Sequence, residues 1–152
     1  MPGTQTRLAE FVPYRMAITS GAVSGAIASE YRSQFGLKIS EWRIMAVLGD
    51  AGPLTQRDLV RATQMDKVAV NRACKVLEER GFVQRSPNVA DGRSHHLELT
   101  GEGCSVHAQI WPQALEIYEE IFAALTPRET AKLRVLLDKL LNAVRKFEGQ
   151  AR

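Results

Sequence analysis

The residues with the most specific chemistry lie on one side of a helix expected at positions 66–80. At about 100° per residue, four residues share that side of the helix: Val68, Asn71, Arg72 and Lys75. Arginine and asparagine can each make two hydrogen bonds to the edge of a guanine or an adenine, and valine can contact a thymine methyl group. The pattern therefore predicts a face that reads bases in the major groove of DNA. The alternative is an ordinary solvated helix face.

A second set of residues lies between two short strands, expected at 82–85 and 94–99. Gly92 and its polar neighbours favour a turn, so the two strands should form a hairpin. Asp91 precedes Arg93 by two residues, which is close enough for the carboxylate to orient the guanidinium. An arginine held at a loop tip suits a narrow minor groove, where the negative potential is deepest. We therefore expect Asp91 and Arg93 at the tip of a DNA-contacting hairpin.

The histidines and cysteines do not form a catalytic or metal-binding pattern. His95 and His96 are adjacent on an expected strand and so point to opposite faces, and His107 lies apart from them. Cys74 and Cys104 lack the spacing of a disulfide framework, which indicates reduced thiols. The sequence also shows neither a glycine-rich phosphate loop nor a nucleophile paired with a base. We therefore predict no enzyme, no metal site and no cofactor.

Helix signals place the reading face on the second helix of a helix-turn-helix. Thr55 is expected to cap a short helix, with Asp58 three residues later completing a capping box. Asp66 is expected to cap the helix that carries the reading face. Upstream, Gly36 should end a long helix and Ser40 should cap the next one. The hairpin then follows as the wing of a winged helix-turn-helix.

Long helices are expected before and after this winged helix-turn-helix, which we call the reader. Apolar and small residues recur at helical spacing from Leu8 to Phe35, and apolar spacing resumes from Val106 to Leu125. Thr126 and Glu129 form a second capping box, which starts a last helix. One side of that helix is apolar, with Leu133, Leu136, Leu137, Leu140, Leu141, Val144 and Phe147. We expect the first and last helices to form a dimer interface, although a stripe of this kind can also belong to a core.

The composition permits DNA binding without requiring it. The chain has 152 residues and a net charge of +3, with a pI near 9.1. Residues 55–100 contain eight Lys or Arg against six Asp or Glu, which is a small excess. No apolar run approaches the roughly 18 residues of a membrane span, and no signal peptide is recognisable. We therefore expect a cytoplasmic protein without a membrane partner.

Four stretches carry a family resemblance, at 40–48, 54–59, 70–83 and 91–100. Together they resemble the MarR family of bacterial transcriptional regulators. The resemblance implies a homodimer, with a winged helix-turn-helix in each subunit and a dimerisation lobe built from the first and last helices. It also implies that Arg93 is the wing arginine and that Asp91 orients it, while Asn71 and Arg72 occupy recognition-helix positions. The sequence departs from the family at Gly92, where arginine is common, and at Asn71, where Ser or Thr is usual.

The predicted fold is mainly α with a small β-hairpin wing. The expected divisions are an N-terminal helix of the dimerisation lobe at 1–39, the DNA-binding domain at 40–100, and C-terminal helices completing the lobe at 101–152. The candidate DNA-binding residues are Thr55, Gln56, Lys67, Val68, Asn71, Arg72, Lys75, Arg85, Asp91, Arg93 and Ser94.

The predicted function is that of a repressor on a pseudo-palindromic operator of double-stranded DNA. The resemblance implies release by a small effector, such as an aromatic carboxylate or an acyl thioester. Candidate ligand-binding residues are Tyr14, Arg15, Trp42 and Trp111, with Arg15 as a carboxylate partner. Two alternatives stay open: a winged-helix module that binds a protein partner, and a thiol-based redox regulator acting through Cys74 or Cys104.

Overall fold

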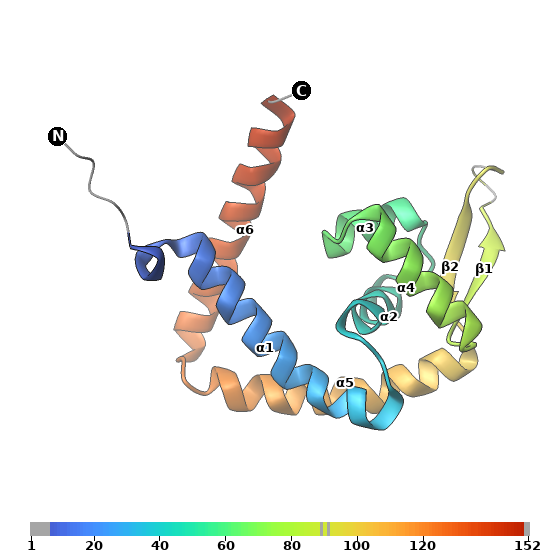
Figure 1. Cartoon of the computed structure of the whole chain (residues 1–152), viewed down its shortest axis with the longest axis horizontal. Helices are drawn as coiled ribbons and strands as arrows, with labels where there is room; N and C mark the ends of the chain where they lie inside the picture. Colours follow the sequence, from blue (N-terminus) through green and yellow to red (C-terminus); the bar gives the residue numbers. More distant parts are fainter. Residues whose placement is uncertain (1–6, 89, 91, 151–152) are drawn as a thin grey trace. The chain divides into compact units, whose positions relative to one another are not determined.

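The computed structural model describes residues 7–88, 90 and 92–150, which are mostly helical and include one β-hairpin (Figure 1). After a 3-10 turn at Leu8–Glu10 the helices are, in chain order, α1 (Val12–Phe35), α2 (Ile39–Ala51), α3 (Gln56–Thr63), α4 (Lys67–Glu79), α5 (Gly101–Phe122) and α6 (Pro127–Gln150). The strands β1 (Val83–Pro87) and β2 (His95–Leu99) lie between α4 and α5. These elements confirm the predicted fold class.

The local signals that end and begin the helices behave largely as predicted. Gly36 ends α1 in the left-handed conformation, with φ of 63°. The Thr55 hydroxyl accepts from the Asp58 backbone N–H at 3.1 Å, and the Asp58 carboxylate accepts from the Thr55 N–H at 3.1 Å. The Asp66 carboxylate accepts from the Ala69 N–H at 2.8 Å. Both predicted caps of the helix-turn-helix are therefore confirmed.

The prediction that Ser40 caps α2 is wrong. The helix begins one residue earlier, at Ile39, and its N-cap is Lys38. The Lys38 backbone N–H donates to the Glu41 carboxylate at 3.0 Å. A glutamate at the third helical position therefore closes this end, because its side chain can reach back to the N-cap N–H whatever residue stands there.

The hairpin is antiparallel, and its register pairs Val83 with Leu99 and Pro87 with His95. A short segment before α3 extends it, because Leu54 and Leu97 exchange backbone hydrogen bonds of 3.0 and 2.7 Å. The middle of β2 is thus attached to the segment that precedes α3. No sequence pattern predicted the bridge between Leu54 and Leu97, since Leu54 is a single residue next to a proline.

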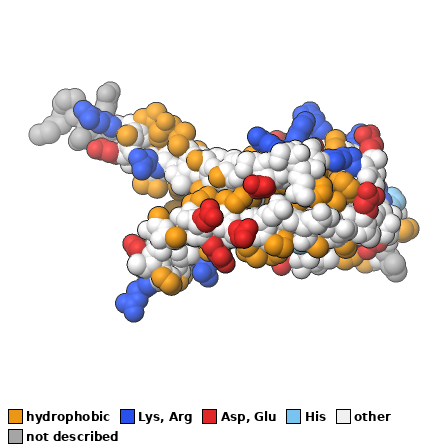
Figure 2. Space-filling model, turned by 90° about the horizontal axis from the view of Figure 1, so that it is seen from below, with side chains coloured by type: hydrophobic (Ala, Val, Ile, Leu, Met, Phe, Trp, Pro, Cys, Tyr) orange, Lys and Arg blue, Asp and Glu red, His pale blue; other side chains and the backbone are white. Residues whose placement is uncertain are grey.

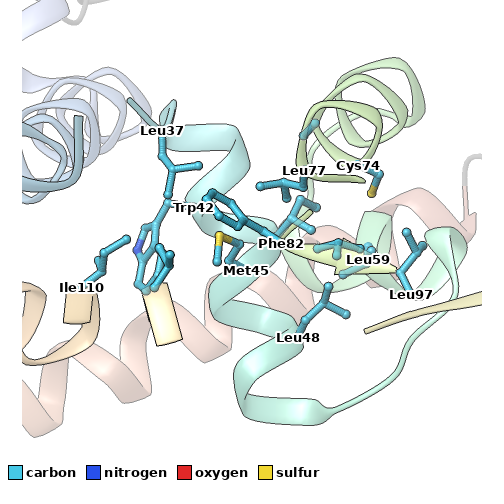
Figure 3. Close-up of a cluster of buried hydrophobic side chains, with 14 of the residues drawn as sticks. Leu37, Trp42, Met45, Leu48, Leu59, Cys74, Leu77, Phe82, Leu97 and Ile110 are labelled. Carbon is cyan, nitrogen blue, oxygen red and sulfur yellow. The ribbon is translucent and has the colours of Figure 1, made fainter. Parts of the chain in front are cut away.

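The core lies between α2, α3, α4 and the hairpin, with the C-terminal half of α1 and the first half of α5 against it. Helix α4 buries the side opposite its predicted reading face, where Val70, Ala73, Cys74 and Leu77 are nearly inaccessible. Figure 3 shows side chains from several elements meeting in this core: Leu37, Trp42, Met45, Leu48, Leu59, Cys74, Leu77, Phe82, Leu97 and Ile110.

The first turn of α5 packs against the link between α4 and β1. The Thr100 hydroxyl donates to the Gly81 carbonyl at 2.6 Å and accepts from the Gly103 N–H at 3.0 Å. The Thr100 N–H donates to the Phe82 carbonyl at 3.0 Å. A β-carbon at Gly103 would overlap that same Phe82 carbonyl oxygen, so only glycine allows the backbones to approach this closely.

The chain divides into two compact units, Met1–Leu115 and Glu116–Arg152. The second unit holds the end of α5 and all of α6. The rings of Tyr118 and Phe122 lie 4.7 Å apart there, and Thr126 and Glu129 form the predicted capping box. Within the described residues, no helix has the length and apolar character that crossing a membrane requires.

Apolar side chains lie open at the surface of the molecule (Figure 2). Helix α6 buries none of its residues and exposes a run of large apolar ones: Val135, Leu136, Leu137, Leu140, Leu141, Val144 and Phe147. The N-terminal segment exposes Leu8, Phe11, Val12, Tyr14, Met16 and Ile18. Soluble monomers rarely leave so many large apolar residues exposed without a partner.

Candidate nucleic-acid interface

The outer face of α4 is available for contact, as its periodicity predicts. Val68 is 65% exposed, although it is apolar, and Arg72 and Lys75 are exposed with it. Asn71 is half-buried and lies beside α3, where the Gln56 amide donates to its Oδ1 at 3.4 Å. Because α4 is anchored by its apolar side, these side chains project from a rigid support.

A groove of about 980 Å³ adjoins this face, between α3, the start of α4 and the wing. Its cationic lining residues come from three elements and the wing loop: Arg57, Arg61, Lys67, Arg85 and Arg93. Asp58 is the acidic residue among the described residues that line it. Clustered cations along an open groove favour a polyanion such as the DNA backbone.

The groove brings together several residues that the sequence could only name separately. Six predicted DNA-binding residues line it: Thr55, Gln56, Lys67, Arg85, Arg93 and Ser94. Asp91, predicted to orient Arg93, lies outside the described residues. Val68, Asn71, Arg72 and Lys75 lie on the neighbouring outer face of α4. Reading face and groove together are suited to contact one duplex.

Eight groove residues were missing from the predicted set, namely Arg57, Asp58, Val60, Arg61, Asn88, Ala90, His95 and His96. The two arginines are four residues apart on α3 and so lie on one side of it, which is a signal that the spacing contained. The two histidines belong to β2, and only the fold brings that strand next to α3. Sequence alone offered no sign of their proximity.

Neighbouring groups of the protein hold the groove residues Arg85 and Asp58. The Arg85 guanidinium forms an ion pair with the Glu78 carboxylate at 2.7 Å, from β1 to the end of α4. The pKa of Asp58 is lowered, first by the hydrogen bond from the Thr55 backbone N–H and next by the Thr55 side chain. Asp58 therefore completes the capping box of α3, and its charge does not indicate a separate site.

The base of the wing loop is closed by Asn88. Its N–H donates to the Ser94 carbonyl at 3.2 Å, and its amide donates to the Ser94 hydroxyl at 2.9 Å. The Asn88 Oδ1 also accepts from the Ala90 N–H at 3.1 Å. These bonds restrict the loop that carries Arg93, whose side chain is exposed.

The four candidate ligand residues lie in two places. Trp42 is only 7% exposed and belongs to the core, whereas Trp111 is exposed on α5. His107 lies between their rings, with centroids 5.4 Å from Trp42 and 6.1 Å from Trp111. Burial lowers the pKa of His107, which favours its neutral form. Tyr14 and Arg15 are exposed in the first turn of α1, and no contact joins them to either tryptophan among the described interactions.

The two cysteines differ sharply in environment. Cys74 is fully buried on the inner side of α4, and burial raises the pKa of its thiol to about 11. Cys104 is exposed in the first turn of α5. Because the thiolate is the reactive form, Cys74 should be inert in the native protein.

We expect one thiol per chain to react with an aromatic disulfide reagent in native protein, at roughly pH 8. In a Cys104→Ser variant the fast reaction should disappear and return only after unfolding, which absorbance of the released thiol would measure. The matched Cys74→Ser variant should keep the fast reaction. Rapid reaction of native Cys104→Ser would contradict burial of Cys74 and revive the redox alternative.

The sequence matches the model of the MarR family over residues 35–94. It is 33% identical over 96 residues to the uncharacterised HTH-type transcriptional regulator YwoH of Bacillus subtilis, covering 63% of this chain and 69% of that protein. It is 30% identical over 99 residues to the HTH-type transcriptional repressor NicR of Pseudomonas putida, covering 65% and 63%. The fold is also similar to the structure of Bordetella bronchiseptica BpsR, with a TM-score of 0.74 and 25% identity, over 85% of this chain and 97% of that one. The DNA binding of BpsR is regulated by 6-hydroxynicotinic acid.

Proposed function

The chain belongs to the MarR family of transcriptional regulators, and on this premise we propose that it is a homodimeric repressor that binds a pseudo-palindromic operator. Members of this family are regulators and not enzymes. The observation that carries the proposal is the cationic groove beside the exposed face of α4. A helix in the major groove and a wing arginine along the minor groove would use these two surfaces together. Such a protein works beside the chromosome, in the cytoplasm.

The exposed apolar residues of α6 and of the N-terminal segment support the homodimer. A second copy of the chain is the simplest cover for each of these two sets of residues, because two-fold symmetry brings the same residues of both subunits to an interface. The proposed dimerisation lobe comprises 1–39 and 101–152, and the reader 40–100. The relative NicR is a repressor, which supports repression for this chain.

A small aromatic effector is the proposed signal. BpsR, which responds to 6-hydroxynicotinic acid, supports an aromatic acid, and an acyl thioester is the second class to test. Trp111 offers an exposed ring and Trp42 a buried wall behind His107, while Tyr14 and Arg15 are exposed on α1. To empty the operator, the effector must favour the unbound state by about 5 kcal/mol.

The function is tested by selecting duplexes from a random library and measuring their affinity by fluorescence anisotropy at several salt concentrations. Affinity should fall steeply with salt, with log K decreasing by about 0.9 for each neutralised phosphate. Sedimentation should show a dimer. A chain that binds no DNA in a salt-sensitive way would instead be a winged-helix module for a protein partner. A thermal-shift screen of aromatic acids and acyl thioesters, followed by release of the selected duplex, tests the effector.

Asn71→Ala should cost about 1–3 kcal/mol on the selected duplex and far less on random DNA, since a base contact carries sequence information. Arg72→Ala should behave similarly. Lys75→Ala is the matched control for a phosphate contact, with a similar loss on both duplexes. A Gln56→Ala and Asn71→Ala double-mutant cycle should reveal coupling, because Gln56 donates to Asn71. Equal losses for Asn71→Ala on both duplexes would reassign Asn71 to the phosphate backbone.

A further inference from the structure

Arg80, the residue that ends the reading helix α4, is bound to the end of α1. Its guanidinium donates to the Phe35 carbonyl at 2.5 Å and to the Gly36 carbonyl at 3.4 Å. The same guanidinium lies over the Phe82 ring, 4.8 Å from its centroid. One side chain therefore links two helix ends that are more than forty residues apart in the chain.

The chemistry of this contact suits arginine in particular. The last carbonyls of a helix lack partners within the helix and carry a negative partial charge. A planar guanidinium offers several donors in a fixed geometry, so one arginine can serve two adjacent carbonyls. Phe82 is 6% exposed and cannot move away, which holds the guanidinium in place.

Helix α1 can carry this contact over a distance because it is continuous for 24 residues. Its N-terminal part exposes apolar residues, and its C-terminal part is seated in the core of the reader through Ala28 and Tyr31. A further contact lies midway, where the Arg43 guanidinium donates to the Ser24 hydroxyl at 3.3 Å. The shared core and the Arg80 hydrogen bonds therefore fix the position of α4 relative to α1.

We propose that Arg80 is a positioning residue that sets the separation of the two recognition helices, so that the dimer accepts one spacing between half-sites. The proposal rests on the proposed homodimer, in which α1 belongs to the interface. Both guanidinium hydrogen bonds go to backbone carbonyls at the C-terminal end of α1, so the role needs no contact between Arg80 and DNA. Without Arg80, each reader keeps its reading face but tilts more freely against α1.

The test is duplex selection with the wild type and with Arg80→Ala, each followed by sequencing. The wild type should select two half-sites at one separation, about 10 base pairs between centres. Arg80→Ala should select the same half-site sequence with a broadened range of separations, and should bind the wild-type duplex about 10-fold more weakly. Loss of stability alone would lower the active fraction but would leave the selected separation unchanged.

Two variants complete the design. Arg32→Ala removes an exposed arginine from the last turn of α1 and should select as the wild type does, which controls for charge near this end. Arg80→Lys keeps the positive charge but lacks the planar guanidinium with its several donors. It should broaden the range of selected half-site separations less than Arg80→Ala does. If Arg80→Ala does not fold, the lysine variant decides by the same criterion. A wild-type separation in the folded Arg80 variants overturns the proposal, whereas a wild type that selects single half-sites overturns the dimeric operator instead.

Discussion

Arg93→Ala should weaken binding to the selected duplex roughly 10- to 100-fold while leaving the fold intact. Arg93 is exposed in the wing loop and lines the cationic groove with Lys67 from α4. A guanidinium in a narrow minor groove replaces bound counterions and meets a strongly negative potential. Because the Arg93 side chain is exposed at the surface, the thermal unfolding midpoint should be nearly unchanged in the alanine variant.

The salt dependence shows which contact has been lost. If Arg93 neutralises a phosphate, the slope of log K against log salt should fall by about 0.9 in the alanine variant. Arg128→Ala is the control, because Arg128 is an exposed arginine at the start of α6 and its loss changes the net charge equally. Should Arg93→Ala bind as tightly as the wild type in an anisotropy titration, the assignment of the wing would be wrong.

Gly103→Ala should lower the free energy of unfolding by about 1–3 kcal/mol or more. The added carbon would meet the Phe82 carbonyl, which is backbone and is fixed by the Thr100 N–H. Either α5 shifts away or the link from α4 to β1 distorts, and both changes loosen the wing. The thermal midpoint should fall by several degrees, measured at equal protein concentrations.

Gly101→Ala is the matched control for this substitution. It lies in the same first turn of α5, but a β-carbon there meets no atom within 4 Å. Its effect on the midpoint should be small, within about 0.5 kcal/mol. A Gly103→Ala variant as stable as Gly101→Ala would mean that the first turn of α5 is not packed on the Phe82 backbone.

Local interactions explain why so much of the fold was predictable. The caps at Thr55 and Asp66 and the stop at Gly36 depend on groups three or four residues apart, whose geometry is nearly the same in any protein. The buried and exposed sides of α4 follow from the helical period alone. The one misplaced cap, Ser40, arose because Glu41 can close the helix from Lys38 equally well.

Contacts between different helices and strands could not be predicted from sequence patterns. The Leu54 bridge to Leu97, the Glu78 partner of Arg85 and the Phe35 partner of Arg80 each join different elements. Such pairs depend on the relative placement of whole elements, and a single sequence contains no period or spacing that records it. The same reason hid the two α3 arginines as groove residues, although their spacing was visible.

The order of the elements, the exposed side of α4 and the position of the hairpin could be predicted from the sequence, because they follow from periodicity, capping and turn chemistry within a few residues. Three features became visible only in the folded structure: the cations that share one groove, the burial of Cys74 in the core, and the binding of Arg80 to the end of α1. Side-chain neighbours from distant parts of the chain depend on how the helices and strands pack. Packing is a property of the folded chain as a whole.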